Sequence, residues 1–360
     1  MTDLLALVAE LVDTPSVSHD EAAVASFVES QLSSCGGLEV VRLGDNVVAR
    51  TALGRAKRVV LAGHLDTVPP SGNERARIEG DVCHGLGTVD MKGGVAVLVA
   101  LARALVEPVY DLTYVFYVCE EVEHRYSGLE AVDGARPDLL AADAALVLEP
   151  TGGVVEAGCQ GVMRFVVTTR GTAAHVARPS MGDNALHRLG AVLAAAAGFA
   201  DRHPVLDGCE YRESLQAVWA DGGSRQRANV VPDRASALFS HRFAPDRDGE
   251  EALAAVEALL GPALDYRAGD TIEVEEVDAP APPSLGDPFL AALVAASGAP
   301  ARAKLGWTDV SHFAGRGVPA TNFGPGDPDL CHHPDEHISR GELESTYATL
   351  RSLLGGPSAR

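Results

Sequence analysis

The sequence predicts an α/β fold in which a mostly parallel sheet, with helices on both faces, is interrupted by an inserted second domain. Three observations predict it. Short apolar runs of strand character alternate with helical patterns through the first 160 residues, which is typical of βαβ units. Near residue 162 the pattern changes to an alternation of polar and apolar residues. A proline-rich run at 279–283 ends the changed segment and has the composition of a hinge.

The first part of the chain supplies the elements of the parallel sheet. Residues 112–119 are mainly apolar and aromatic, as expected of a strand buried on both faces. Gly93 and Gly94 stand near the start of one helical pattern, where they allow close approach of the backbone. The elements predicted in this part are helices at 3–13 and 20–34, strands at 38–42, 46–51 and 58–62, a buried helix at 93–106, and strands at 112–119 and 144–148.

The segment after residue 162 has the pattern of one β-α-β-β-α-β unit, a ferredoxin-like insert. Its predicted elements are a strand at 163–170, a helix at 184–200, strands at 214–220 and 235–243, a helix at 248–260 and a strand at 271–277. A helix at 288–297, a short strand at 321–323 and a helix at 340–354 follow. We therefore predict one discontinuous domain, residues 1–161 and 279–360, and an inserted domain, residues 162–278.

Composition limits the kinds of partner. The formal net charge is −21, from 29 basic and 50 acidic residues. Such a charge repels phosphate backbones and anionic lipids, so we expect no nucleic-acid or membrane partner. The six cysteines form no C-x-x-C pair, the first ten residues lack a signal pattern, and the apolar stretch 189–200 is too short to cross a bilayer. We therefore expect a soluble, cytoplasmic protein.

Acidic and histidine side chains stand at the points where apolar runs stop. Strand ends in open α/β sheets are where ligands are held. Imidazole together with several carboxylates is a ligand set for first-row metals, and zinc uses it in catalytic sites that keep a position open for water. The sequence therefore predicts a metal site. Its candidate residues are His64, Asp66, Asp90, Glu120, Glu121, Glu149 and His332.

Each of these residues alone has an ordinary explanation. Asp90 has the position of a helix cap. Glu120 and Glu121 could form a solvated charged turn, although one of two adjacent carboxylates could equally bind metal while the other acts as a general base. His332 could be one of a solvated histidine pair. Their common placement at element boundaries favours the metal site.

With these residues and their order, the chain resembles the M20 metallopeptidase and amidohydrolase family over essentially its full length. The resemblance implies a zinc-hydrolase catalytic domain that binds two Zn²⁺ per subunit, with Co²⁺ as a possible substitute, and an inserted dimerisation or lid domain. It also implies a cis Asp90–Met91 peptide. It implies that His64, Asp90 and Glu149 bind one zinc, that Asp90, Glu121 and His332 bind the other, that Asp66 orients His64, and that Glu120 is the general base for the zinc-activated water.

Three further segments resemble the actinobacterial type of N-succinyl-LL-diaminopimelate desuccinylases. They are residues 171–185, residues 229–232 leading to Arg242, and residues 305–310 with 322–328. The resemblance implies hydrolysis of N-succinyl-LL-2,6-diaminopimelate to succinate and LL-2,6-diaminopimelate, a precursor of lysine and peptidoglycan. It implies a homodimer formed through the insert, in which His175 reaches the partner's active site and stabilises the oxyanion. It assigns substrate binding to Arg178, Asn229, Arg242 and Thr308.

The chemistry of this substrate agrees with those residue types, because it carries three carboxylates and a guanidinium binds a carboxylate through two hydrogen bonds. For Arg178 and Arg242 the alternative is a surface ion pair. Three other functions stay open or are disfavoured. Another M20 activity, such as acetylornithine deacetylase, aminoacylase or dipeptidase, is open; a non-catalytic binding member would not need Glu120; and a nucleotide-binding protein would need a G-x-G-x-x-G turn after the first strand, which is absent.

Overall fold

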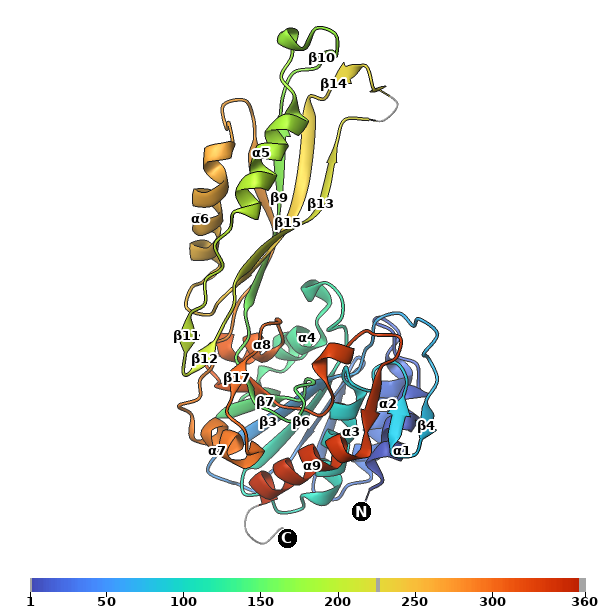
Figure 1. Ribbon diagram of the computed structural model, residues 1–360. Coiled ribbons are helices and arrows are strands. Elements are labelled where there is room, and N and C mark those ends of the chain that lie inside the picture. The colour runs from blue at the N-terminus through green and yellow to red at the C-terminus, as the bar shows by residue number, and fades with distance from the viewer. Residues whose placement is uncertain (1, 225–226, 356–360) are drawn as a thin grey trace. The chain divides into compact units, whose positions relative to one another are not determined.

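The computed structural model describes residues 2–224 and 227–355, and these form two compact units (Figure 1). The first unit contains the chain up to Gly158, Pro283–Arg302 and the chain from Thr308 onward. The second contains Cys159–Pro282 and Ala303–Trp307. Within the described ranges, no helix is both long and apolar enough to cross a membrane.

The first unit is built on a large sheet whose central strands β6, β3, β7 and β18 run parallel. The strands on either side, β1 and β2 at one edge and β8 beside β18, pair antiparallel. The predicted fold class is confirmed. In sheet order the strands are β1 (Glu39–Leu43), β2 (Asn46–Arg50), β6 (Asp111–Tyr117), β3 (Arg58–His64), β7 (Ala144–Val147), β18 (Ala320–Asn322), β8 (Glu156–Ala157) and β17 (Arg302–Ala303).

Both faces of this sheet are covered, which explains the continuous apolar runs of its central strands. All seven residues of β6 are buried. On β3, Val59 and Leu61 point into one core, while Val60 and Ala62, on the alternate face, are also buried. The helices of this unit are α1 (Leu4–Val12), α2 (Ala22–Ser33), α3 (Lys92–Ala104), α4 (Gly128–Ala135), α7 (Pro288–Ser297), α8 (Val310–Gly315) and α9 (Arg340–Gly355).

Helix α3 begins so close to its neighbours that positions 93 and 94 have no room for side chains, as the glycine pair predicted. A Cβ atom at Gly94 would lie 2.4 Å from the carbonyl oxygen of Leu148, and one at Gly93 would lie 2.7 Å from that of Thr88. Asp90 precedes this helix and Glu149 follows Leu148. Gly94 therefore lets α3 start against Leu148, which brings the acidic residue before α3 to the end of β7.

Lys92, at the start of α3, is 3% exposed, and its Nζ donates hydrogen bonds to the carbonyl oxygens of Leu11 and Thr14. Burial lowers its pKa from 10.5 to about 8. Between these values the unfolded chain holds a proton that the folded chain has released, so folding stability rises with pH. We expect the free energy of unfolding of the wild type, relative to Lys92→Met, to grow by about 3 kcal/mol between pH 8 and 10.5. Urea unfolding of both proteins in chelator measures this; a constant difference would contradict it.

The second unit has a four-stranded antiparallel sheet with two helices packed against it (Figure 1). Its order along the chain is β9, α5, β13, β15, α6, β16, and its strand order is β13-β15-β9-β16, which agrees with the predicted ferredoxin-like unit. The bounds are β9 (Gly161–Arg170), α5 (Ala185–Ala197), β13 (Ser214–Gly222), β15 (Arg234–Phe243), α6 (Gly249–Leu260) and β16 (Thr271–Asp278). The short pairs β10 (Ala174–His175) with β14 (Val230–Val231), and β11 (Val205–Leu206) with β12 (Cys209–Glu210), complete it.

The helices of the second unit begin at the residues that their capping side chains dictate. The Asn184 side chain accepts hydrogen bonds from the backbone N–H groups of Leu186 and His187, so α5 starts one residue after the predicted position. Asp248 and Glu251 form a reciprocal capping box at the start of α6. Phe165 of β9 and Phe239 of β15 stack with ring centroids 5.2 Å apart under these helices.

The units divide a few residues away from the boundaries expected at 162 and 278. Cys159 and Ala281 exchange two backbone hydrogen bonds, of 3.1 and 3.0 Å. The two segments that lead into and out of the second unit therefore pair with each other beyond the ends of β9 and β16. The expected boundaries were set by the apolar alternation in the sequence. That alternation begins after Cys159 and ends before Ala281, so it does not include the paired residues. The expected division also left residues 303–307 with the first domain, whereas they cluster with the second unit.

Candidate metal centre

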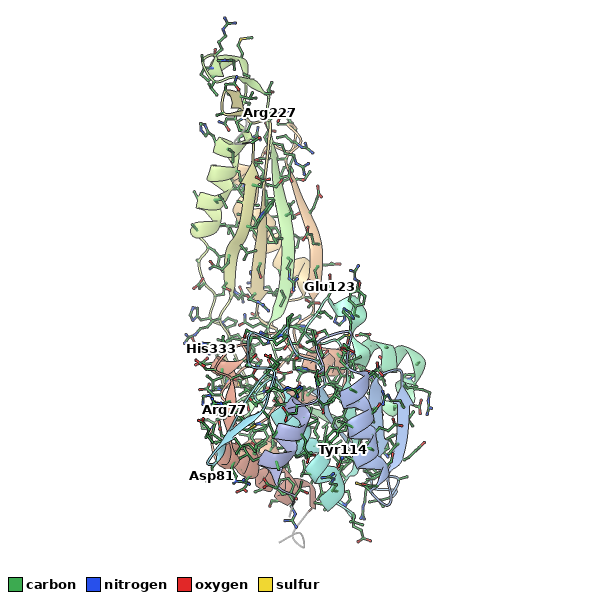
Figure 2. All side chains as sticks on the ribbon, turned by 90° about the vertical axis from the view of Figure 1, so that its right-hand side faces the viewer. Arg77, Asp81, Tyr114, Glu123, Arg227 and His333 are labelled. Atoms are coloured by element: carbon green, nitrogen blue, oxygen red, sulfur yellow. The ribbon has the colours of Figure 1, made fainter. Side chains whose placement is uncertain are left out.

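Three neighbouring parallel strands carry the predicted ligands at their carboxyl ends. His64 is the last residue of β3, Glu121 follows β6, and Glu149 follows β7. Because β3 lies between β6 and β7 and runs parallel to both, these three ends meet at one edge of the sheet. Figure 2 labels Glu123 and His333, sequence neighbours of the site residues, near one end of the first unit and Tyr114 of β6 deeper within it.

The predicted metal ligands form two groups that share one carboxylate. His64, Asp90 and Glu149 present ligand atoms within 4.8 Å of one another, and so do Asp90, Glu121 and His332. The shared residue is Asp90: its Oδ1 lies 3.0 Å from Nε2 of His64, and its Oδ2 lies 3.3 Å from Nε2 of His332. The structure therefore brings all five sequence-predicted ligands together. The Asp90–Met91 peptide is cis, as predicted.

The remaining contacts close each group. Nε2 of His332 lies 2.8 Å from Oε1 of Glu121, and Nε2 of His64 lies 3.9 Å from Oε1 of Glu149. Burial opposes ionisation of Asp90, but the two imidazoles hold the pKa of its carboxyl group well below the usual range. The same contacts with Asp90 and Glu121 raise the pKa of His332 to about 10. A carboxylate with one oxygen toward each imidazole has the arrangement of a bridge between two cations.

Asp66 is fully buried and ties the strand ends together. Its Oδ1 accepts the backbone N–H of Glu120 at 3.0 Å, and its Oδ2 accepts that of Glu121 at 3.0 Å and the hydroxyl of Ser18 at 2.8 Å. Nδ1 of His64 lies 3.1 Å from the carbonyl oxygen of Asp66 and 3.5 Å from its Oδ1. A proton on Nδ1 leaves the lone pair of Nε2 for a metal. Ser18 had no signal in the sequence pattern, because its contribution is one hydroxyl contact.

Glu120 stands beside both groups. Its ligand oxygen also lies within 4.8 Å of those of His64 and Glu121, so distance alone does not separate a ligand from a general base. Burial, reinforced by the carboxylates of Glu149, Asp309 and Glu121, raises the pKa of Glu120 well above its ordinary value. A carboxyl group of raised pKa suits proton transfer near neutral pH.

Asp309 was missed as a member of this environment. It is 2% exposed, and burial raises the pKa of its carboxyl group. In the sequence it is simply the residue after Thr308, within the segment 305–310 that carries part of the family resemblance. Glu336 was missed as well. Its carboxylate accepts hydrogen bonds from the backbone N–H groups of Gly87, Val89 and Asp90, and such contacts leave no mark in the side-chain sequence.

A further group of possible ligands, Glu130, Asp133 and His312, lies elsewhere in the first unit. Its side chains already have partners. Arg316 contacts Asp133, and Nδ1 of His312 lies 2.8 Å from Oε1 of Glu130. We therefore assign this group to an ion-pair cluster between α4 and α8.

The residues predicted to act on substrate lie in three places. In the second unit His175, Arg178 and Asn229 are neighbours: the backbone N–H of Arg178 bonds to the carbonyl of His175 at 2.7 Å, and that of Val176 bonds to the carbonyl of Asn229 at 3.0 Å. This group lies near the start of β15, because His175 pairs with Val230, four residues before Arg234. Arg242 lies near the other end of β15, eight residues after Arg234, or about 26 Å along an extended strand.

Thr308 lies in the first unit, where it is 3% exposed and its hydroxyl donates to Oδ1 of Asn322 at 2.8 Å. The structure therefore gathers the group around His175 but does not gather Arg242 with it within one chain.

Comparison with known proteins agrees with this architecture. The family model described as peptidase family M20/M25/M40 matches residues 60–355. The chain is 48% identical to "Putative succinyl-diaminopimelate desuccinylase DapE" of Mycobacterium tuberculosis, over 98% of each protein. It is 42% identical to the succinyl-diaminopimelate desuccinylase of Corynebacterium glutamicum, over 98% of this chain and 96% of that protein. A tripeptidase from Staphylococcus aureus has the same fold, with a TM-score of 0.80 at 18% identity, covering 98% of this chain and 97% of the tripeptidase.

Proposed function

On the premise that this chain belongs to peptidase family M20/M25/M40, we propose that it hydrolyses the succinyl amide of N-succinyl-LL-2,6-diaminopimelate, releasing succinate and LL-2,6-diaminopimelate. The observation that carries the proposal is the pair of ligand groups joined by Asp90, with Glu120 beside them. The choice of substrate is supported by identities of 48% and 42% to relatives that bear the name of this activity.

The donor set suits two divalent cations. Each group offers one imidazole nitrogen and two carboxylates, which is a usual set for zinc. Two divalent cations would neutralise the negative charge of the three carboxylates, Asp90, Glu121 and Glu149. We assign His64, Asp90 and Glu149 to the first cation and Asp90, Glu121 and His332 to the second, with Zn²⁺ as the proposed metal and Co²⁺ as a substitute. When bound, the two cations would activate a water molecule and polarise the amide carbonyl.

The protein's own residues then move and hold the proton. Glu120 accepts a proton from the attacking water and donates it to the leaving amine. Asp66 fixes the backbone of Glu120 and Glu121, and it keeps Nε2 of His64 directed at Asp90. In this arrangement one carboxylate organises both a ligand and the base, so the base stays in place while its proton is transferred.

A homodimer formed through the second unit is the proposed assembly. Arg242 and the group of His175, Arg178 and Asn229 are separated by most of the length of β15, which exceeds the length of a succinylated amino acid. We therefore assign the group around His175 to the partner's site, where His175 stabilises the oxyanion. Edge strand β13 supports an interface, because Val218 and Trp219 are 58% and 52% exposed on it.

Within one chain, Arg242 and Thr308 are the remaining substrate residues of the proposal. Burial lowers the pKa of Arg242, a cost that a substrate carboxylate would offset. All six cysteines are free thiols, which suits the proposed cytoplasmic location.

The test is a comparison of substrates on one preparation. We expect turnover of N-succinyl-LL-diaminopimelate to exceed that of N-acetylornithine, N-acyl amino acids and small dipeptides by at least about a hundredfold in kcat/KM, since the groups assigned to the extra carboxylates would have no partner on the smaller substrates. Chelator should abolish turnover and Zn²⁺ should restore it. Sedimentation equilibrium should give the mass of two chains. A higher kcat/KM for one of the other substrates would contradict the proposed substrate and assign the protein another activity of the same family.

A further inference from the structure

Glu336 is a buried carboxylate that holds the loop in front of Asp90. It is 1% exposed. Its Oε2 accepts the backbone N–H of Gly87 at 2.9 Å, and its Oε1 accepts those of Val89 at 2.8 Å and Asp90 at 3.0 Å. Three backbone donors on one side chain fix this loop more firmly than a single cap would, because charged acceptors form the stronger hydrogen bonds.

The backbone of Glu336 contributes to the same connection. Its carbonyl oxygen accepts the N–H of Gly85 at 3.0 Å, and its own N–H donates to the carbonyl of His333 at 3.0 Å. Directly after it, β19 (His337–Ser339) pairs with β5 (Val82–His84). The segment that carries His332 and the loop that carries Asp90 are therefore joined by Glu336 and by the strand pair beside it, although they are more than 240 positions apart in the sequence.

The two ligand groups depend unequally on this junction. In the second group, Asp90 and His332 both lie on the joined segments, and only Glu121 lies outside them. In the first group Asp90 alone lies there, whereas His64 ends one central strand of the sheet and Glu149 follows another. Loosening the junction should therefore disturb two of three donors in the second group and one of three in the first.

We propose that Glu336 is a positioning residue for the second cation, holding Asp90 and His332 in register so that the two-cation site is complete. The inference rests on the proposed function only in requiring that both ligand groups bind metal. Loss of Glu336 should selectively weaken the second cation, whereas a residue that serves folding alone would weaken neither, or both in proportion to stability.

The variants are Glu336→Gln and Glu336→Ala. In the first, one amide oxygen can still accept two N–H groups, while the amide NH₂ cannot accept the third. In the second, all three are lost. The matched control is Asp111→Asn. Asp111 is also a buried carboxylate that accepts two backbone N–H groups, from Leu53 at 2.8 Å and Arg55 at 2.9 Å, but it begins β6, at the end of that strand opposite Glu120.

The measurement is a zinc titration of metal-free protein by calorimetry against a competing chelator, together with thermal unfolding of the same metal-free samples. His332→Ala identifies which step belongs to the second group. For Glu336→Ala we expect the dissociation constant of that step to rise by about ten- to a hundredfold, with the other step changed much less. Glu336→Gln should fall between Glu336→Ala and the wild type. Asp111→Asn should lower the melting temperature and leave both steps unchanged.

Three results would overturn the proposal: an unchanged second step in both Glu336 variants, equal weakening of both steps, or the same selective loss in Asp111→Asn. A wild type that binds a single cation would overturn it too. If Glu336→Ala does not fold, Glu336→Gln decides alone by the same criteria. No substrate is used, so a preparation that binds two cations but fails to cleave N-succinyl-diaminopimelate would count against the proposed substrate and not against Glu336.

Discussion

Replacement of Glu120 by glutamine should lower kcat by about 10²- to 10⁴-fold, the range that a positioned general base contributes, while both cations remain bound. Glutamine keeps the volume of the side chain and the backbone N–H that Asp66 accepts. It removes the ability to take a proton from water and return it to the amine. Because the substrate would still be bound by other residues, KM should change little compared with kcat.

The measurement is steady-state kinetics on N-succinyl-LL-diaminopimelate, with bound zinc counted on the same samples. Glu123→Gln is the control: Glu123 is three residues away, its side chain is 59% exposed, and its partner is Arg125 at 3.5 Å. It changes the net charge equally and should retain wild-type turnover. A Glu120→Gln protein that loses one cation would instead make Glu120 a ligand with His64 and Glu121, the other grouping that the distances permit.

The site could be predicted from the sequence to the extent that its residues follow strands. His64, Glu121 and Glu149 stand just after apolar runs, and parallel strands place such residues at one edge. Asp90 and His332 lie on irregular segments. The sequence named both as candidates from their place at element boundaries, but only the family resemblance implied which ligand group each joins. The same distinction explains the fold: long apolar or alternating runs identified the sheet and the insert, because their burial is visible in the side chains.

The connections between segments could not be predicted, since they are made by backbone groups. The pairing of β4 (Arg77–Glu79), β5 and β19 joins strands of three residues each, which are too short to show an apolar periodicity. Backbone N–H groups like those around Glu336 are available at nearly every position of any chain, so no side-chain pattern could select these. The unit boundaries at Cys159 and Pro282 differ from the expected ones for the same reason, because backbone groups of Cys159 and Ala281 make the pairing there.

Replacement of Asp90 by alanine should have the largest effect on metal binding, because Asp90 is the one residue common to both ligand groups. Without it the first group keeps His64 and Glu149, and the second keeps Glu121 and His332. Two protein donors per cation fall short of the three that a catalytic zinc site uses. We expect both dissociation constants to rise by more than about a hundredfold, the upper cost of losing only an outer hydrogen bond to a ligand, and turnover to be lost with them.

Variants of the unshared ligands test whether Asp90 serves both cations. Glu149→Ala should weaken the first cation and His332→Ala the second, each leaving the other step close to wild type, whereas Asp90→Ala should weaken both. Asp81→Ala removes an exposed carboxylate paired with Arg340 at 3.0 Å and should weaken neither. An Asp90→Ala protein that binds one zinc with wild-type affinity would show that the carboxylate serves a single cation. The facing of its two oxygens toward His64 and His332 would then reflect only the ion pairs of the carboxylate with the two imidazoles.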